Sequence, residues 1–166
     1  MYFSEKGFEV TGIDISEEMI KAANIKNIPH CRFQVADAHS LSFSDSSFDI
    51  GAAITTLEFS ENPERIIYEL ARCVKPKGKL LFGVLNSLSS YNQKRQNNSK
   101  SVYAYGRFFS PKQLKNLLER FGTIKMRIAA FVIRSKWLIW LSPLYEGLCR
   151  FIGSRKGAFI AAEVQL

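Results

Sequence analysis

Two aspartates end apolar runs of this chain, and their carboxylates could hold a nucleoside. Asp14 closes the run Phe8–Asp14 and is followed by Ser16, a suitable helix N-cap. Asp37 closes the run Arg32–Asp37. Each carboxylate offers two acceptor oxygens, so the first acid could hold a ribose diol and the second the exocyclic amine of an adenine. A helix cap or a solvated turn residue is the alternative interpretation of Asp14.

These acids need a frame of alternating strands and helices to bring them together. Apolar, β-branched runs bounded by turn residues predict six strands. They are Phe8–Asp14, Arg32–Asp37, Phe48–Thr56, Lys79–Asn86, Thr123–Val132 and Ala158–Leu166. The clearest helix is Pro63–Val74, whose apolar residues recur three and four positions apart after the N-cap Asn62. Other helices begin at Ser16 and at Ser110.

Alternation of this kind predicts an α/β fold with right-handed crossovers and a mostly parallel sheet covered by helices. Ligands of such sheets bind beyond the carboxyl ends of the strands, which is where both aspartates are expected. With 166 residues and 46% hydrophobic content, the chain suits one core, so we expect residues 1–166 to form a single domain.

Charge and cysteines exclude some classes of function. The net charge of +8 could favour phosphates, nucleic acid or anionic lipid, but the basic residues are scattered, as on an ordinary solvated surface. Cys31, Cys73 and Cys149 fit no zinc spacing, which predicts reduced thiols, no metal site and a cytoplasmic location. No signal-peptide pattern opens the chain, and the apolar stretch Trp137–Tyr145 is too short to span a bilayer.

Two segments interrupt the alternation. Residues 87–106 are rich in Ser, Asn, Gln and Lys without an apolar period, which predicts a long loop or lid; a plain disordered excursion is the alternative. Residues 134–156 combine Trp and Leu with Arg and Lys before the final strand. They could cap an apolar substrate site, touch a membrane surface as a peripheral contact, or simply pack on the sheet.

Four short motifs lie at the predicted strand ends and turns. They are Gly12-Ile13-Asp14-Ile15-Ser16 through Met19, Ala36-Asp37-Ala38 with Leu41 and Phe43, Ser47-Phe48-Asp49, and Leu70-Ala71-Arg72 with Pro76-Lys77-Gly78. In these motifs the chain resembles the UbiE-like (type 11) class I S-adenosylmethionine-dependent methyltransferases over roughly residues 7–125. The resemblance implies a Rossmann-like class I methyltransferase sandwich whose C-terminal strand is antiparallel.

The resemblance also implies S-adenosylmethionine as the cofactor and gives residues their roles. Family members bind the cofactor ribose with an acid after one strand, flank the adenine with neighbouring apolar residues, and contact the adenine amine with an acid after the next strand. Those positions are here Asp14, Ile15, Met19, Asp37 and Ala38. A further segment lines the cofactor and the substrate, here Thr55, Thr56, Leu57 and Glu58.

The methyl acceptor is predicted to be a small molecule bound near the 87–106 segment. Aromatic side chains would shape its pocket, and an arginine would meet any anionic group. The residues predicted for this role by location are Asn86, Tyr91, Tyr103, Tyr105 and Arg107. No catalytic base is assigned, because displacement at a sulfonium depends mainly on positioning.

The resemblance implies a glycine turn about 20 residues before the ribose acid. Thirteen residues precede Asp14, so we expect the first strand, its glycine turn and most of the first helix to be missing from this sequence. The backbone amides of that turn would hold the methionine half of the cofactor. We therefore expect weak or absent cofactor binding and doubtful activity from these 166 residues alone.

Other functions remain open. An NAD(P)-dependent dehydrogenase also binds ribose with an acid after its second strand, although the chain carries no glycine fingerprint. A non-catalytic remnant or regulatory partner could have kept the sheet and lost the cofactor. Nucleic-acid binding through Lys94, Arg95, Lys100 and Arg107 has less support and is not expected.

Overall fold

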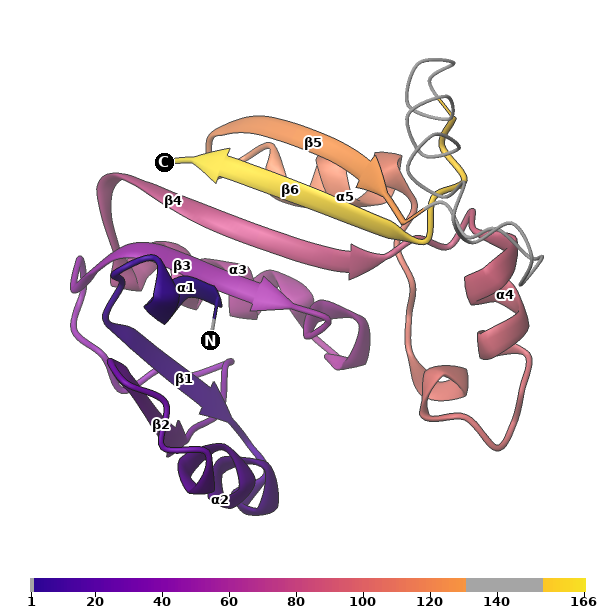
Figure 1. Cartoon of the computed structure of the whole chain (residues 1–166). Helices are drawn as coiled ribbons and strands as arrows, with labels where there is room; N and C mark the ends of the chain where they lie inside the picture. The colour runs from indigo at the N-terminus through magenta and orange to yellow at the C-terminus, as the bar shows by residue number, and fades with distance from the viewer. Residues whose placement is uncertain (1, 131–153) are drawn as a thin grey trace. The chain divides into compact units, whose positions relative to one another are not determined.

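The computed structural model describes residues 2–130 and 154–166 (Figure 1). The chain divides into two compact units, Met1–Ser44 and Asp45–Leu166. No helix in the described ranges has the length and apolar character needed to cross a bilayer. The apolar, basic segment expected at 134–156 lies outside the described residues except for 154–156, so its predicted roles stay predictions.

The first unit is built on two parallel strands. Its elements are α1 (Tyr2–Glu5), β1 (Val10–Asp14), α2 (Glu17–Ile25) and β2 (Cys31–Val35). The register runs from Val10 opposite Cys31 to Asp14 opposite Val35. Ser16 caps α2, since its hydroxyl accepts the backbone N–H of Met19 at 3.3 Å. Because the strands are parallel, their carboxyl ends meet at one edge.

The second unit contains the larger sheet. Its elements are β3 (Phe48–Ile54), η1 (Leu57–Phe59), α3 (Pro63–Cys73), β4 (Val74–Leu85), α4 (Ser90–Gln96), η2 (Val102–Tyr105), α5 (Pro111–Leu118), β5 (Thr123–Ala129) and β6 (Phe159–Gln165). Strand order is β3-β4-β6-β5, with β3 parallel to β4 and β6 antiparallel to both neighbours (Figure 1). The predicted mostly parallel sheet with an antiparallel C-terminal strand is confirmed.

Helix α3 follows its sequence pattern closely. The side chain of Asn62 accepts the backbone N–H of Arg65 at 3.1 Å, and Pro63 stands in the first turn. The apolar stripe of the helix buries Ile66 and Ile67. Burial of a side chain of this size contributes about 1.5–3 kcal/mol, so α3 is held mainly by packing.

Strand β4 begins earlier than the predicted Lys79. Val74 already pairs with Phe48, and a register shift follows on β3 between Phe48 and Ile50. Gly78 sits in this irregular stretch, where a Cβ atom would lie 2.7 Å from the carbonyl oxygen of Asp49. The turn residues that end α3 therefore also form the bulged start of β4.

The segment predicted as a long loop, 87–106, contains the helix α4 and the 3-10 turn η2. Its sequence lacks an apolar period because the residue that α4 buries is polar. Nδ2 of Asn92 donates to the carbonyl oxygens of Asn86 at 3.0 Å and Ala158 at 2.6 Å. Hydrogen bonds to the ends of β4 and β6 thus replace the usual apolar contact.

Candidate functional site

Asp14 stands at the carboxyl end of β1, as predicted. Its Oδ1 accepts the backbone N–H of Ser16 at 2.9 Å, which fixes the carboxylate at the turn into α2. In the part of the chain that the structure describes, the second oxygen accepts no hydrogen bond. The carboxylate is thus positioned by its own turn while keeping acceptor capacity for a hydroxyl donor such as a ribose diol.

Asp37 follows β2 on the same edge of the first unit. Its Oδ1 accepts the backbone N–H of His39 at 2.8 Å and lies 2.7 Å from Nδ1 of the same histidine. The hydrogen bond from the His39 backbone N–H lowers the pKa of Asp37 most, and the hydrogen bond with the His39 side chain lowers it further. The acid is therefore an anion at neutral pH. His39 was not predicted as a partner, although the Asp-x-His spacing of a local turn could have indicated it.

Apolar side chains flank the two acids. Ile15 is 73% exposed and Met19 is 60% exposed, which is unusual for residues of this size. Ala38 is half-buried beside Asp37. Exposed apolar surface next to free carboxylate oxygens suits an adenosine, whose base presents an apolar face and a polar edge. All the residues predicted for the adenosine lie in the first unit, and they fit such a group.

Thr55 follows β3 in the second unit and has a strained backbone. Its φ of +51° is rare for a β-branched residue and costs about 1–3 kcal/mol. The backbone N–H of Thr55 donates to the carbonyl of Gly83 at 2.7 Å, and the exposed Oγ1 donates to the carbonyl of Ile54 at 2.8 Å. Leu57, also predicted for the cofactor, is fully buried, so its side chain belongs to the core.

Glu58 links the ends of β3 and β4 from inside the second unit. The side chain is almost fully buried, and its Oε1 accepts the backbone N–H of Leu85. Its own backbone carbonyl accepts the N–H of Arg107 at 2.7 Å. Oε2 is buried and has no partner among the described residues. Burial raises the pKa of Glu58 despite the Leu85 hydrogen bond.

Asn86, predicted as an acceptor contact, uses its side chain within the protein. Nδ2 donates to the carbonyls of Arg155 at 2.8 Å and Gly157 at 2.7 Å, while Oδ1 accepts the N–H of Leu88 at 3.0 Å. The residue is fully buried. These contacts join the end of β4 to the start of β6, and a clamp between strands accounts for this asparagine.

An aromatic cluster contains two of the predicted acceptor residues. The ring of Tyr103 lies 6.3 Å from that of Phe59 and 6.4 Å from that of Phe108. The guanidinium of Arg95 lies 3.5 Å from the centroid of Tyr103 and 5.4 Å from that of Tyr91. The sequence pattern did not single out Arg95 for the acceptor.

The remaining predicted acceptor residues lie outside this stack. Tyr105 is 85% exposed, and the side chain of Arg107 is also exposed. Neither ring nor guanidinium has a stacking contact among the described residues. The structure therefore places Tyr91 and Tyr103 around Arg95. It leaves the side chains of Tyr105 and Arg107 exposed to solvent.

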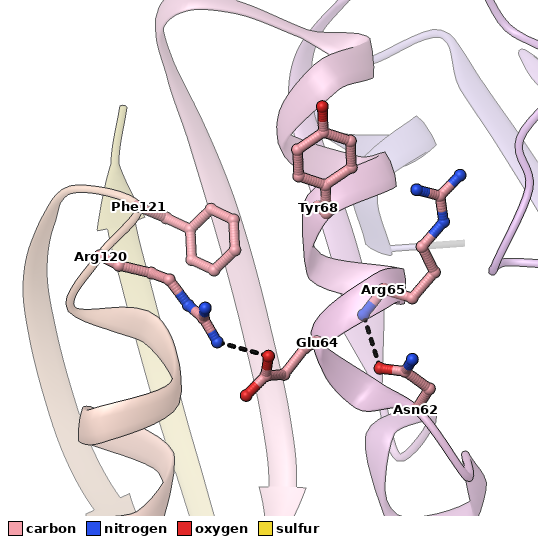
Figure 2. Close-up of a pocket in the computed structure, with 6 residues that line it drawn as sticks. All are labelled: Asn62, Glu64, Arg65, Tyr68, Arg120 and Phe121. Atoms are coloured by element: carbon pink, nitrogen blue, oxygen red, sulfur yellow. Dashed lines mark hydrogen bonds and ion pairs between the residues drawn. The ribbon is translucent and has the colours of Figure 1, made fainter.

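A separate surface cavity of about 340 Å³ lies between α3 and the segment after α5 (Figure 2). It is lined by Asn62, Glu64, Arg65, Tyr68, Arg120 and Phe121. Figure 2 shows the ion pair between Arg120 and Glu64, whose N···O distance is 2.7 Å, spanning the two elements. None of the residues predicted for cofactor or acceptor lines it, so we assign it no role in binding either.

Sequence comparison finds a family for the N-terminal half. Residues 1–82 match the family model described as a methyltransferase domain. An uncharacterized protein of Methanocaldococcus jannaschii is 34% identical over 115 residues, which cover 67% of this chain and 54% of that protein. A ubiquinone biosynthesis O-methyltransferase of Idiomarina loihiensis is 31% identical over 87 residues, which cover 50% of this chain and 36% of the enzyme.

A longer match joins the chain to a 2-methyl-6-phytyl-1,4-hydroquinone methyltransferase of Synechocystis, 27% identical over 161 residues. It covers 87% of this chain and 48% of that enzyme, so the chain spans about half the length, or less, of these curated relatives.

Solved structures share the fold. A SAM-dependent methyltransferase of Thermotoga maritima superposes with a TM-score of 0.73 at 24% identity, covering 93% of this chain and 72% of that one. A SAM-dependent methyltransferase of Archaeoglobus fulgidus gives a TM-score of 0.71 at 17% identity, covering 99% and 79%.

Proposed function

This chain belongs to the class I S-adenosylmethionine-dependent methyltransferases, and on that premise we propose that it transfers a methyl group to a small-molecule acceptor. One observation carries the proposal. Asp14 and Asp37 each keep a free carboxylate oxygen at the carboxyl edge of β1 and β2, next to exposed apolar side chains.

In this proposal the residues of the first unit hold the adenosine of the cofactor. Asp14 accepts from the ribose hydroxyls, and Asp37 accepts from the adenine amine. Ile15, Met19 and Ala38 cover the faces of the base. When bound, S-adenosylmethionine supplies an activated methyl group on a sulfonium, an excellent leaving group.

The second unit contributes the acceptor side in this proposal. The strained turn at Thr55 carries an exposed hydroxyl just after β3. Tyr91, Tyr103 and the exposed pair Tyr105 and Arg107 shape the acceptor site. Reaction then depends on orientation of the acceptor, since in-line displacement gains most of its rate from positioning.

The relatives support a small organic acceptor. Two of them are named for ubiquinone biosynthesis and for 2-methyl-6-phytyl-1,4-hydroquinone. We extend to this chain only the coarser class of small molecule. The free thiols of Cys31 and Cys73 are consistent with the cytoplasmic location that we propose.

The test compares two nucleoside ligands in one titration series. S-adenosylhomocysteine and NADH are titrated separately into the protein up to millimolar concentration while amide shifts are followed by NMR. We expect saturable shifts at Asp14, Ile15 and Ala38 with S-adenosylhomocysteine and none with NADH. Preference for NADH would favour a dehydrogenase, and no response to either would favour a non-catalytic remnant; both would contradict the proposal.

A further inference from the structure

Arg95 carries a positive charge that the described protein leaves without a carboxylate partner. Two other arginines of the second unit each pair with an acid, Arg72 with Glu69 at 2.8 Å and Arg120 with Glu64 at 2.7 Å. Arg95 makes no ion pair or side-chain hydrogen bond within residues 2–130 and 154–166. Among the residues that the structure describes, its five N–H donors therefore have no acceptor and can serve a bound anion.

The segment of the sequence around Arg95 contains no acidic residue. Between Glu69 and Glu119 there is no Asp or Glu, and the same interval includes Lys94, Lys100 and Arg107. Glu58 contacts this segment, but its carboxylate is buried and accepts the backbone N–H of Leu85. Burial also raises the pKa of Glu58, which reduces its negative charge. The segment is thus locally cationic.

The guanidinium is also held in place. Its carbon lies 3.5 Å from the Tyr103 centroid and 5.4 Å from that of Tyr91, so two aromatic rings attract the cation. The rings of Phe59 and Phe108 lie 6.3 Å and 6.4 Å from the Tyr103 ring and pack beside it. A stacked arginine loses less entropy on binding an oxyanion than a free one.

The helix that carries Arg95 is anchored as well. Asn92 ties α4 to the ends of β4 and β6 through two buried hydrogen bonds. Gln96, one residue after the arginine, donates to the carbonyl of Gly106 at 2.8 Å. The stack thereby occupies a defined place after the carboxyl ends of β3 and β4, the usual ligand edge of a parallel sheet.

We propose that Arg95 receives an anionic oxygen of the methyl acceptor, so that the acceptor is a small carboxylate or phosphate. The inference rests on the proposed function and names its substrate class. Nucleic acid is a poorer match, because base stacking needs an open ring face, and Arg95 lies over the face of Tyr103.

The test uses simple aromatic probes of different charge, of which benzoate and benzamide have the same shape. Benzoate, phenyl phosphate and neutral benzamide are titrated into the protein, and the ring signals of Tyr91 and Tyr103 are followed by NMR. We expect both anions to bind and benzamide to bind much more weakly. Arg95→Gln should weaken the anions about tenfold or more, because a hydrogen bond to a charged group contributes about 1.5–3 kcal/mol.

Two further variants make the result specific. Arg95→Lys keeps the positive charge and loses the planar arrangement of donors. Its affinity for the anions should therefore lie between those of wild type and Arg95→Gln. Lys100→Gln removes the same charge from an exposed position of the same segment and should leave binding within about twofold. Equal binding of benzamide, or equal loss in Lys100→Gln and Arg95→Gln, would overturn the proposal.

Two controls separate this inference from its premise and from a lipid source of phosphate. S-adenosylhomocysteine should bind wild type and Arg95→Gln alike. If it binds neither protein, the proposed function is contradicted, and the anion titrations still show separately whether Arg95 binds an anion. Vesicles of phosphatidylcholine with phosphatidylglycerol test a lipid headgroup. Arg95-dependent binding to vesicles without binding of phenyl phosphate or benzoate would contradict a small acceptor.

Discussion

The carboxylate of Glu58 accepts the backbone N–H of Leu85 in the interior of the second unit. One buried acid thus fixes the turn after β3 against the end of β4. The same residue receives the N–H of Arg107 on its backbone carbonyl. Because Phe59 and Tyr103 of the aromatic cluster lie on or next to these segments, Glu58 helps to hold that cluster in place.

Replacing Glu58 should separate its hydrogen bond from its charge. Glu58→Ala leaves the Leu85 N–H buried without an acceptor and should lower the free energy of unfolding by about 2 kcal/mol or more. Glu58→Gln keeps an acceptor oxygen of the same shape and should not show the loss seen in Glu58→Ala. Urea denaturation of the three proteins at pH 7 measures both values, and equal loss in the two variants would contradict a hydrogen-bonding role.

The raised pKa of Glu58 predicts the direction of a pH effect. The folded protein keeps the Glu58 proton at pH values where the unfolded chain has lost it. This contribution to stability is complete below the ordinary carboxyl pKa and is lost as the pH rises through the raised value. The stability of Glu58→Gln relative to wild type should therefore increase as the pH rises above the ordinary carboxyl pKa of about 4.3. A constant difference would show that the carboxyl titrates normally.

Asn92 provides a test of how α4 is anchored. Asn92→Ala removes both buried hydrogen bonds, to Asn86 and Ala158, and should cost about 2 kcal/mol. The control Asn97→Ala changes an exposed asparagine at the end of the same helix and should cost well under 1 kcal/mol. Thermal unfolding followed by circular dichroism compares them. Similar melting temperatures would mean that α4 does not depend on Asn92.

The strands, and the places of Asp14 and Asp37 at strand ends, could be predicted because their signals are local. The six strand runs and the positions of Asp14 and Asp37 follow from apolar periodicity, turn residues and short motifs. Helix α4 was missed because its anchor, Asn92, is polar and bonds to residues distant in the sequence. Helical apolar patterns do not detect an anchor of that kind.

The aromatic cluster around Tyr103 was harder to predict, because it is formed by tertiary contacts. Arg95 and Tyr103 meet through the turn between α4 and η2, and Phe59 arrives from a different strand end. Composition showed only scattered basic residues there. Asn86 seemed available for a ligand from its place after β4, whereas its amide is engaged with the carbonyls of Arg155 and Gly157. Long-range hydrogen bonds of this type leave no periodic signal in a sequence.

Calorimetric titration of S-adenosylhomocysteine into wild type, Asp14→Ala and Glu9→Ala tests the central claim most directly. Glu9 is an exposed acid just before β1, at the opposite end of that strand from Asp14, and serves as the matched control. We predict that Asp14→Ala weakens binding at least about tenfold, the loss expected for hydrogen bonds to a charged group, while Glu9→Ala binds like wild type. Equal affinity of all three proteins, or equal loss in both variants, would contradict an adenosine site at Asp14.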